Sequence, residues 1–371
     1  MFRLFSGFFF FYFSVIGIYI VFLPKVLQLL NYSSMQVGIV FAIAPLTRFL
    51  VPFLFRQYFK LNTPIFYLAL FLALFSALLF YITIHDFRLF IFPNLLLGAS
   101  LGLILPFIET YSLEHLGKEY YGKSRLFGSL GFMIVAIGLA NILDNPNTGL
   151  NFFLFYILLM IVFGIAITFK NSYFTNSETF EGGINFLTHW GFWLNIFFIQ
   201  MSFGAFYNFF TIYQTDAGVS LEITGWMWAF GVICEIILFY FQGIFLSRFG
   251  LLSLVQFSSF MTSIRWLLLF LFPGFIFVAF FSQAFHAFSF ALHHSAAFSY
   301  LQATYKNRSL AAQFYYGISF GLGAFVGALL AGWLYGPYLY LGASIVAFVG
   351  AVFTKGSLSK NEIAKMNITN V

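Results

Sequence analysis

Charged residues are scarce in this chain. Lysine, arginine, aspartate and glutamate make up 8% of its 371 residues, and 61% are hydrophobic, whereas about 25% of an average soluble domain is charged. So few charges cannot cover a soluble surface. The apolar runs between Phe5 and Phe353 approach the roughly 20 residues that a helix needs to cross a bilayer. The sequence therefore predicts an all-α polytopic protein in a lipid bilayer, and we expect most of its 60 phenylalanines to face lipid.

Cysteine and the common catalytic motifs are also missing. Cys234 is the only cysteine, which excludes an intramolecular disulfide, a CxxC redox pair and a thiolate metal cluster. No predicted span carries an HExxH metal helix or a GxSG serine motif. We therefore expect no catalytic residue, metal or cofactor, and an integral membrane enzyme is the alternative of a different class. The net charge of +6 is scattered over short loops, so nucleic acid is not an expected partner.

Polar breaks divide the apolar sequence into twelve predicted spans. If the N-terminus is cytoplasmic, the loops and tails on that side carry twelve lysines and arginines, and the other side has only Lys25 and Arg88. The positive-inside rule favours this orientation, with both termini in the cytoplasm and the chain in the inner membrane. The longest polar stretch separates six spans from six. The expected parts are an N-terminal six-helix bundle at 1–170, a cytoplasmic linker at 171–188, a C-terminal six-helix bundle at 189–354 and a cytoplasmic tail at 355–371.

A few ionisable residues lie inside the predicted spans. A charge at the bilayer centre costs at least about 2.5 kcal/mol, so such a residue is expected to face a partner or a wet cavity. Glu235 and Arg265 lie deepest, where the side chain cannot reach the interface. Arg48 and Arg125 lie nearer the cytoplasmic ends of their spans, and for them an ion pair that joins helices, or a snorkelling side chain, is an equal alternative.

Histidines and glycines mark two further helix faces. His286 and His293 are seven residues apart, and we expect them to share a face that can bind protons. Hydrogen-bonding core histidines are the alternative, above all for His293. The glycines of the predicted eleventh span favour close helix packing, or a smooth face along which helices slide. These glycines are Gly317, Gly321, Gly323 and Gly327.

The stretch from Tyr121 to Phe132, YGKSRLFGSLGF, resembles a motif of the major facilitator superfamily. It is similar to the motif between the fourth and fifth spans of lactose permease, nucleoside proton symporters and the phenylpropionate permeases. Further similarities follow in the same order along the chain, at Glu235, at Ser263 to Trp266 and at Phe285 to His293. The resemblance implies the major facilitator fold, with twelve transmembrane helices in two six-helix bundles, and it is strongest to the phenylpropionate permeases.

The resemblance also implies which residues bind substrate. In lactose permease the equivalent charged residues line a central cavity for substrate and proton. The residues that it places there in this chain are Glu109, Arg125, Glu235, Arg265 and His286. Lactose permease has a proton-carrying glutamate one helical turn after the histidine, where this chain has Ser289. Proton coupling therefore falls to Glu235, Glu109 or His286.

These observations lead to an expected function. We expect a proton-coupled symporter of a small organic solute, acting as a monomer. Arginine binds carboxylates bidentately, which favours an aromatic or other carboxylic acid, while a nucleoside or a sugar remains an alternative. A proton-coupled exporter of the same fold is the other alternative.

Overall fold

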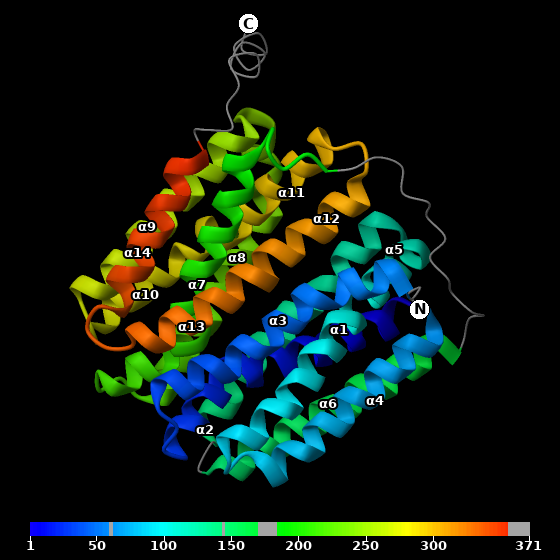
Figure 1. Ribbon diagram of the computed structural model, residues 1–371, viewed down its shortest axis with the longest axis vertical. Coiled ribbons are helices and arrows are strands. Elements are labelled where there is room, and N and C mark those ends of the chain that lie inside the picture. The colour runs from blue at the N-terminus through cyan, green and yellow to red at the C-terminus, as the bar shows by residue number, and fades with distance from the viewer. Residues whose placement is uncertain (59–61, 143–144, 170–183, 355–371) are drawn as a thin grey trace, which may run out of the picture. The chain divides into compact units, whose positions relative to one another are not determined.

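The computed structural model describes residues 1–58, 62–142, 145–169 and 184–354. Among these residues there is no β-strand, and helices account for nearly all of them (Figure 1). Ten helices are long and apolar enough to cross a membrane, and two shorter apolar helices cover Ser34–Leu50 and Leu339–Thr354. The prediction of an all-α chain with twelve apolar helices is confirmed. Most of the predicted linker and the whole predicted tail lie outside the described residues.

The chain forms two compact units. The first consists of the described parts of Met1–Glu178 together with Tyr207–Ala229, and the second of the described parts of Thr179–Phe206 and Phe230–Val371. The first unit therefore includes the end of α7 (Trp190–Asp216) and the start of α8 (Leu221–Arg248). The expected division into two six-helix bundles at 1–170 and 189–354 stays a prediction.

Short polar residues start α4 and α5 in the first unit. The Asn62 side chain accepts a hydrogen bond from the backbone N–H of Ile65, and Asp86 accepts two from the first turn of its helix, as N-caps do. Gly117 interrupts the longest helix with a φ of 70°, which glycine adopts without strain. The helices are α1 (Phe2–Gly17), α2 (Leu23–Leu29), α3 (Ser34–Tyr58), α4 (Thr63–Thr83), α5 (Phe87–Gly138) and α6 (Pro146–Phe169).

The second unit contains two spans with a π-helical turn in the middle. One π-helical turn, Ala287–Leu292, joins α10 to α11, and the other, Gly317–Gly323, joins α12 to α13. Such turns hold extra residues and change the direction in which the following side chains point. Besides α7 and α8, the helices are α9 (Leu251–Leu271), α10 (Ile276–Ala284), α11 (His293–Thr304), α12 (Arg308–Tyr316), α13 (Ala324–Leu334) and α14 (Leu339–Thr354).

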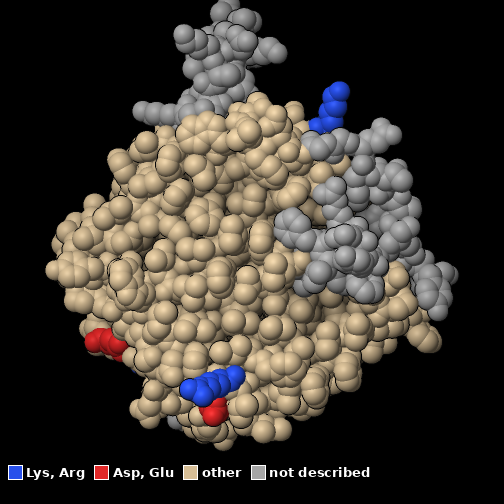
Figure 2. Space-filling view, viewed as in Figure 1, with Lys and Arg blue, Asp and Glu red and all other residues tan. Residues whose placement is uncertain are grey.

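Several polar side chains lie inside the protein, and many large apolar ones lie on its surface. Ile82 and Phe277 are 76% and 74% exposed, whereas Arg265 has no exposed surface. On the face shown in Figure 2, charged residues are few and uncharged residues cover almost all of the described surface. Exposed apolar side chains and buried polar ones suit a hydrocarbon solvent.

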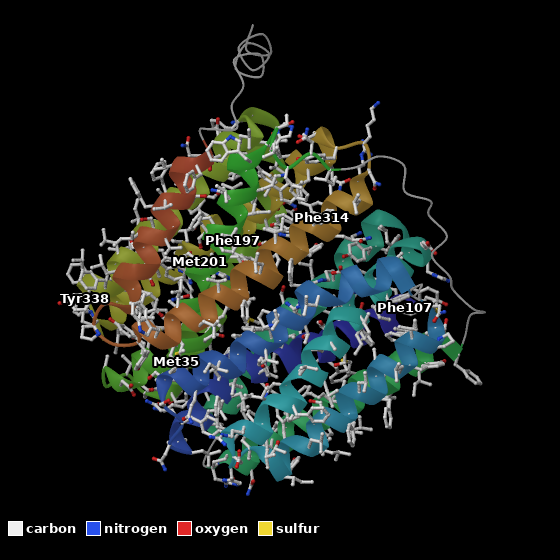
Figure 3. The ribbon with its side chains drawn as sticks, viewed as in Figure 1. Met35, Phe107, Phe197, Met201, Phe314 and Tyr338 are labelled. Atoms are coloured by element: carbon white, nitrogen blue, oxygen red, sulfur yellow. The ribbon has the colours of Figure 1, made fainter. Side chains whose placement is uncertain are left out.

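Phenylalanines build much of the interior of the first unit. Phe5, Phe8 and Phe9 of α1 have no exposed surface. Phe66 on α4 stacks on Phe107 of α5 with ring centroids 4.4 Å apart, and Figure 3 labels Phe107. The expectation that most phenylalanines face lipid is therefore wrong for these five rings. Hydrophobicity alone does not separate the two environments, because a ring is equally at home in lipid and in a packed helix interface.

Glycines allow α7 and α13 to pack backbone to backbone. A Cβ atom added at Gly204 would lie 2.2 Å from the carbonyl carbon of Gly327, and one at Gly323 would lie 2.8 Å from the carbonyl oxygen of Phe197. A Cβ atom added at Gly327 would lie 2.3 Å from the carbonyl oxygen of Met201. Figure 3 labels Phe197 and Met201 on α7. The prediction of close packing is confirmed for Gly323 and Gly327.

Candidate functional site

A buried arginine is the centre of the polar network in the second unit. Arg265, on α9, has no exposed surface. Its Nη1 donates hydrogen bonds to Nδ1 of His286 at 2.8 Å and to Oγ of Ser289 at 3.1 Å. Its Nη2 donates to Oε1 of Gln283 at 2.7 Å. One side chain thus connects α9 to three residues of the span that contains α10 and α11.

Aromatic rings enclose the same guanidinium group. Its central carbon lies 4.3 Å from the ring centroid of Phe206 and 4.5 Å from that of Trp266. Arginine over an aromatic face gains a cation–π attraction that grows when water is excluded. Trp266 is held in turn by a hydrogen bond from its indole N–H to Oγ of Ser202 at 3.1 Å. The arginine is therefore fixed in position as well as buried.

His286 connects this arginine to a carboxylate. Arginine can only donate hydrogen bonds, so Nδ1 of His286 is the acceptor and the proton of the neutral ring is on Nε2. Nε2 lies 3.3 Å from Oε2 of Glu235 on α8. The ring thus accepts from Arg265 on one edge and donates to Glu235 on the other. The structure brings these three predicted residues together in one chain of contacts.

The first unit holds a second pair of predicted residues. Glu109 and Arg125 lie on opposite sides of the break at Gly117, and Nε of Arg125 is 3.4 Å from Oε1 of Glu109. The Arg125 guanidinium carbon lies 3.8 Å from the ring centroid of Phe13 on α1. The two side chains are 32% and 27% exposed. Both side chains of this ion pair are therefore partly exposed, unlike the buried arginine of the second unit.

The two secondary candidates lie outside both networks. Arg48, on α3, is half-buried beside Gly102 of α5, and the carboxylate of Glu109 pairs with Arg125 instead. Nε2 of His293 lies 2.9 Å from Oδ1 of Asn195 on α7.

The two histidines contact different neighbours because a π-helical turn separates them. The ring of His286 stacks on that of Phe290 with ring centroids 5.3 Å apart, and the ring of Phe290 stacks on that of His294 with centroids 6.1 Å apart. The expected face of His286 with His293 is thus replaced by a column of His286, Phe290 and His294.

Sequence reasoning did not single out two buried amides, Gln283 beside Arg265 and Asn195 beside His293. Gln283 accepts a hydrogen bond from Arg265. Nδ2 of Asn195 lies within hydrogen-bond distance of three acceptors, Ser259 Oγ, the Gly350 carbonyl and Thr354 Oγ1. Both amides are fully buried. Each stands as a polar residue in an apolar predicted span, and that was the signal that could have found them.

One stretch of the sequence matches a phosphate-binding motif but does not form a phosphate-binding loop. Residues Gly117 to Ser124 read GKEYYGKS, which matches the Walker A pattern. That motif needs a preceding strand and a loop of free backbone N–H groups. In this structure helix lies on both sides of Gly117, and the described residues contain no strand. The sequence therefore matches the motif, but the structure around Gly117 does not.

Comparison with known proteins identifies the family. The model of the MFS_1 like family matches residues 2–341. The chain belongs to this family. Solved structures confirm the major facilitator fold: a mutant of the nucleoside transporter NupG has a TM-score of 0.78 and 12% identity, with 96% of this chain and 100% of that chain covered. The fucose:proton symporter FucP of Escherichia coli has a TM-score of 0.62 and 16% identity, with 97% and 98% covered.

Curated relatives of this family member are transporters by name. The probable 3-phenylpropionic acid transporter of Escherichia coli strain K12 is 25% identical over 61% of this chain. The maltose permease of Geobacillus stearothermophilus is 25% identical over 76% of this chain and 74% of its own length. The uncharacterized transporter YwbF of Bacillus subtilis strain 168 is 26% identical over 52% of this chain. The chain matches 60% of the length of the first relative and 50% of that of YwbF.

Proposed function

We propose that this protein is a secondary active transporter that carries a small organic solute together with a proton. The observation that carries the proposal is the buried chain of contacts from Arg265 through His286 to Glu235, in a protein of the major facilitator fold. Ionisable residues at membrane depth are costly and typically belong to substrate or proton pathways. The family and the fold are those of transporters, which argues against an enzyme.

Glu235 is the proton carrier in this proposal. A second proton on His286 would occupy Nδ1, and the two N–H groups of Arg265 and His286 would then face each other. Glu235 meets no such conflict, because its carboxylate is 13% exposed and faces only the Nε2 edge of the ring. A proton on Glu235 weakens its attraction to His286. The loaded and unloaded states thus differ in how tightly Glu235 holds α8 to the span that contains α10 and α11.

The arginines supply the substrate preference. Arg125 is one-third exposed and lies against Phe13, which suits a ligand that has both a carboxylate and an aromatic ring. An aromatic or other carboxylic acid is therefore the favoured solute, in line with the name of the phenylpropionic acid relative. A nucleoside or a sugar is the second choice, supported by the names of the nucleoside and maltose relatives.

The orientation of the proposed transporter and the membrane that holds it follow from the distribution of its charged residues. We place both termini in the cytoplasm and the chain in the inner membrane, because the predicted loops on that side carry most of the lysines and arginines. Two six-helix bundles, 1–170 and 189–354, expose one site to either side in turn. The chain acts as a monomer.

Uptake by proteoliposomes tests the proposal. The panel contains labelled 3-phenylpropionate, uridine and maltose, and a pH gradient is imposed with the inside alkaline. We expect at least one compound to accumulate above its outside concentration, and a protonophore to abolish the accumulation. Folded protein that accumulates none of the three would contradict the proposal, and so would accumulation that needs no gradient.

A further inference from the structure

A small polar cavity lies beside the buried arginine network. Its lining includes Gln200 of α7, Ser289 and His293 of the span that contains α10 and α11, and Ser319 of the second π-helical turn. Its volume is about 10 Å³, which is room for about one water-sized group. The π-helical turns at Ala287–Leu292 and Gly317–Gly323 each supply one of the two serines.

His293 lines this cavity and has a ring nitrogen that can accept a hydrogen bond. The Asn195 side chain donates from Nδ2 to the Gly350 carbonyl at 3.0 Å, so its Oδ1 faces His293 and accepts from Nε2 at 2.9 Å. The neutral ring then has an unprotonated Nδ1. His293 is 6% exposed, and no described residue donates to Nδ1. An acceptor inside a protein is usually satisfied by a donor, and the cavity that His293 lines has room for one.

The chemistry of the lining selects a neutral group. A carboxylate brings only acceptors and cannot satisfy Nδ1 of His293. A cation would find no acidic residue in the lining. The Ser289 hydroxyl already accepts from Arg265, so its own proton is available to an incoming oxygen. The rest of the wall is mainly aromatic and consists of Ile199, Phe203, Phe290, His294, Tyr315 and Phe320. A hydroxyl group that donates to the histidine and accepts from a serine meets all of these conditions.

We propose that Gln200, Ser289, His293 and Ser319 form a hydroxyl subsite that binds one neutral hydroxyl group. A water molecule occupies it in the unloaded protein, and a hydroxyl of the transported solute replaces that water in the loaded one. This inference rests on the proposed transport function. It narrows the solute to a compound with a hydroxyl beside an apolar or aromatic surface, such as a hydroxylated aromatic acid, a nucleoside or a sugar.

Matched ligands test the solute part of the inference. Affinities of the purified full chain for 3-phenylpropionate and 3-(4-hydroxyphenyl)propionate are measured by calorimetry. We expect the hydroxylated compound to bind about three- to tenfold more tightly, the effect of one net hydrogen bond. Ser319→Val puts methyl groups into the cavity and should remove this preference. Ser247→Val, at the exposed end of α8, should keep it. Equal affinities in the wild type would overturn the inference.

A spectroscopic measurement separates failure of the subsite from failure of the transport proposal. In protein labelled with ¹⁵N-histidine, the His293 signals are assigned by their loss in His293→Gln. Nδ1 should show the shift of a hydrogen-bonded acceptor without any solute, and Ser319→Val should move it toward the free value. An Nδ1 signal that is free in the wild type would overturn the subsite even if transport is observed. A hydrogen-bonded signal in a protein that binds none of 3-phenylpropionate, its hydroxylated analogue, uridine and maltose would instead contradict the proposed function.

Discussion

Replacement of Arg265 by lysine is expected to destabilise the protein although the charge is kept. Arg265 makes three hydrogen bonds, to His286, Ser289 and Gln283. Lysine is a point charge and cannot reproduce the planar fork, so we expect it to keep one of the three. Hydrogen bonds between membrane helices contribute about 0.6 kcal/mol on average and at most about 1.7. Loss of two therefore lowers the free energy of unfolding by roughly 1–3 kcal/mol.

The assay is unfolding in mixed micelles with increasing dodecyl sulfate, followed by tryptophan fluorescence. Trp266 lies against the arginine, so the signal reports on the same region. Arg248→Lys is the matched control, because Arg248 lies exposed in the last turn of α8, and it should leave unfolding unchanged. If Arg265→Lys unfolds like that control, the hydrogen-bonded fork is not what holds α9 to its neighbours.

Two further substitutions test packing and exposure. Gly204→Val forces a side chain to within 2.2 Å of the Gly327 backbone. Overpacking of this kind lowers the free energy of unfolding by about 1–3 kcal/mol. Gly243→Val is the control: its added side chain meets nothing within 4 Å, so it should unfold like the wild type in the same assay. Glu109→Gln breaks a partly exposed ion pair with Arg125, so the free energy of unfolding should fall by less than about 1 kcal/mol while solute affinity changes. A large loss of stability in Glu109→Gln would show that the pair is structural.

The sequence was sufficient to predict the apolar helices and the ionisable residues inside them. Long apolar runs and polar breaks are strong signals, because backbone in lipid must be helical. The costly residues Glu235 and Arg265 were identifiable for the same reason, since few charges survive at membrane depth. The partner of each charge was not contained in these signals. The partners came from the structure, which joins Arg265 to His286 and Gln283.

The face on which a side chain lies could not be predicted from the sequence where a helix is irregular. A regular helix was assumed between His286 and His293, and the π-helical turn Ala287–Leu292 changes which side chains share a face. Nothing in hydropathy reports an extra residue per turn. The interior phenylalanines of α1 were missed for a related reason. Lipid and packed helix interfaces are both apolar, so only the three-dimensional structure distinguishes Phe9 from a ring that faces lipid.

Proton uptake that accompanies solute entry is the most direct test of the account. Proteoliposomes in weakly buffered medium receive whichever of 3-phenylpropionate, uridine and maltose they take up, and the external pH is recorded. We predict that the wild type and Glu222→Gln, an exposed carboxylate at the start of α8, make the medium more alkaline as solute enters. Glu235→Gln should exchange labelled for unlabelled solute without any change in pH. If Glu235→Gln makes the medium alkaline at the wild-type rate, the assignment of the proton to Glu235 is contradicted. If solute enters wild-type vesicles without making the medium alkaline, proton coupling itself is contradicted.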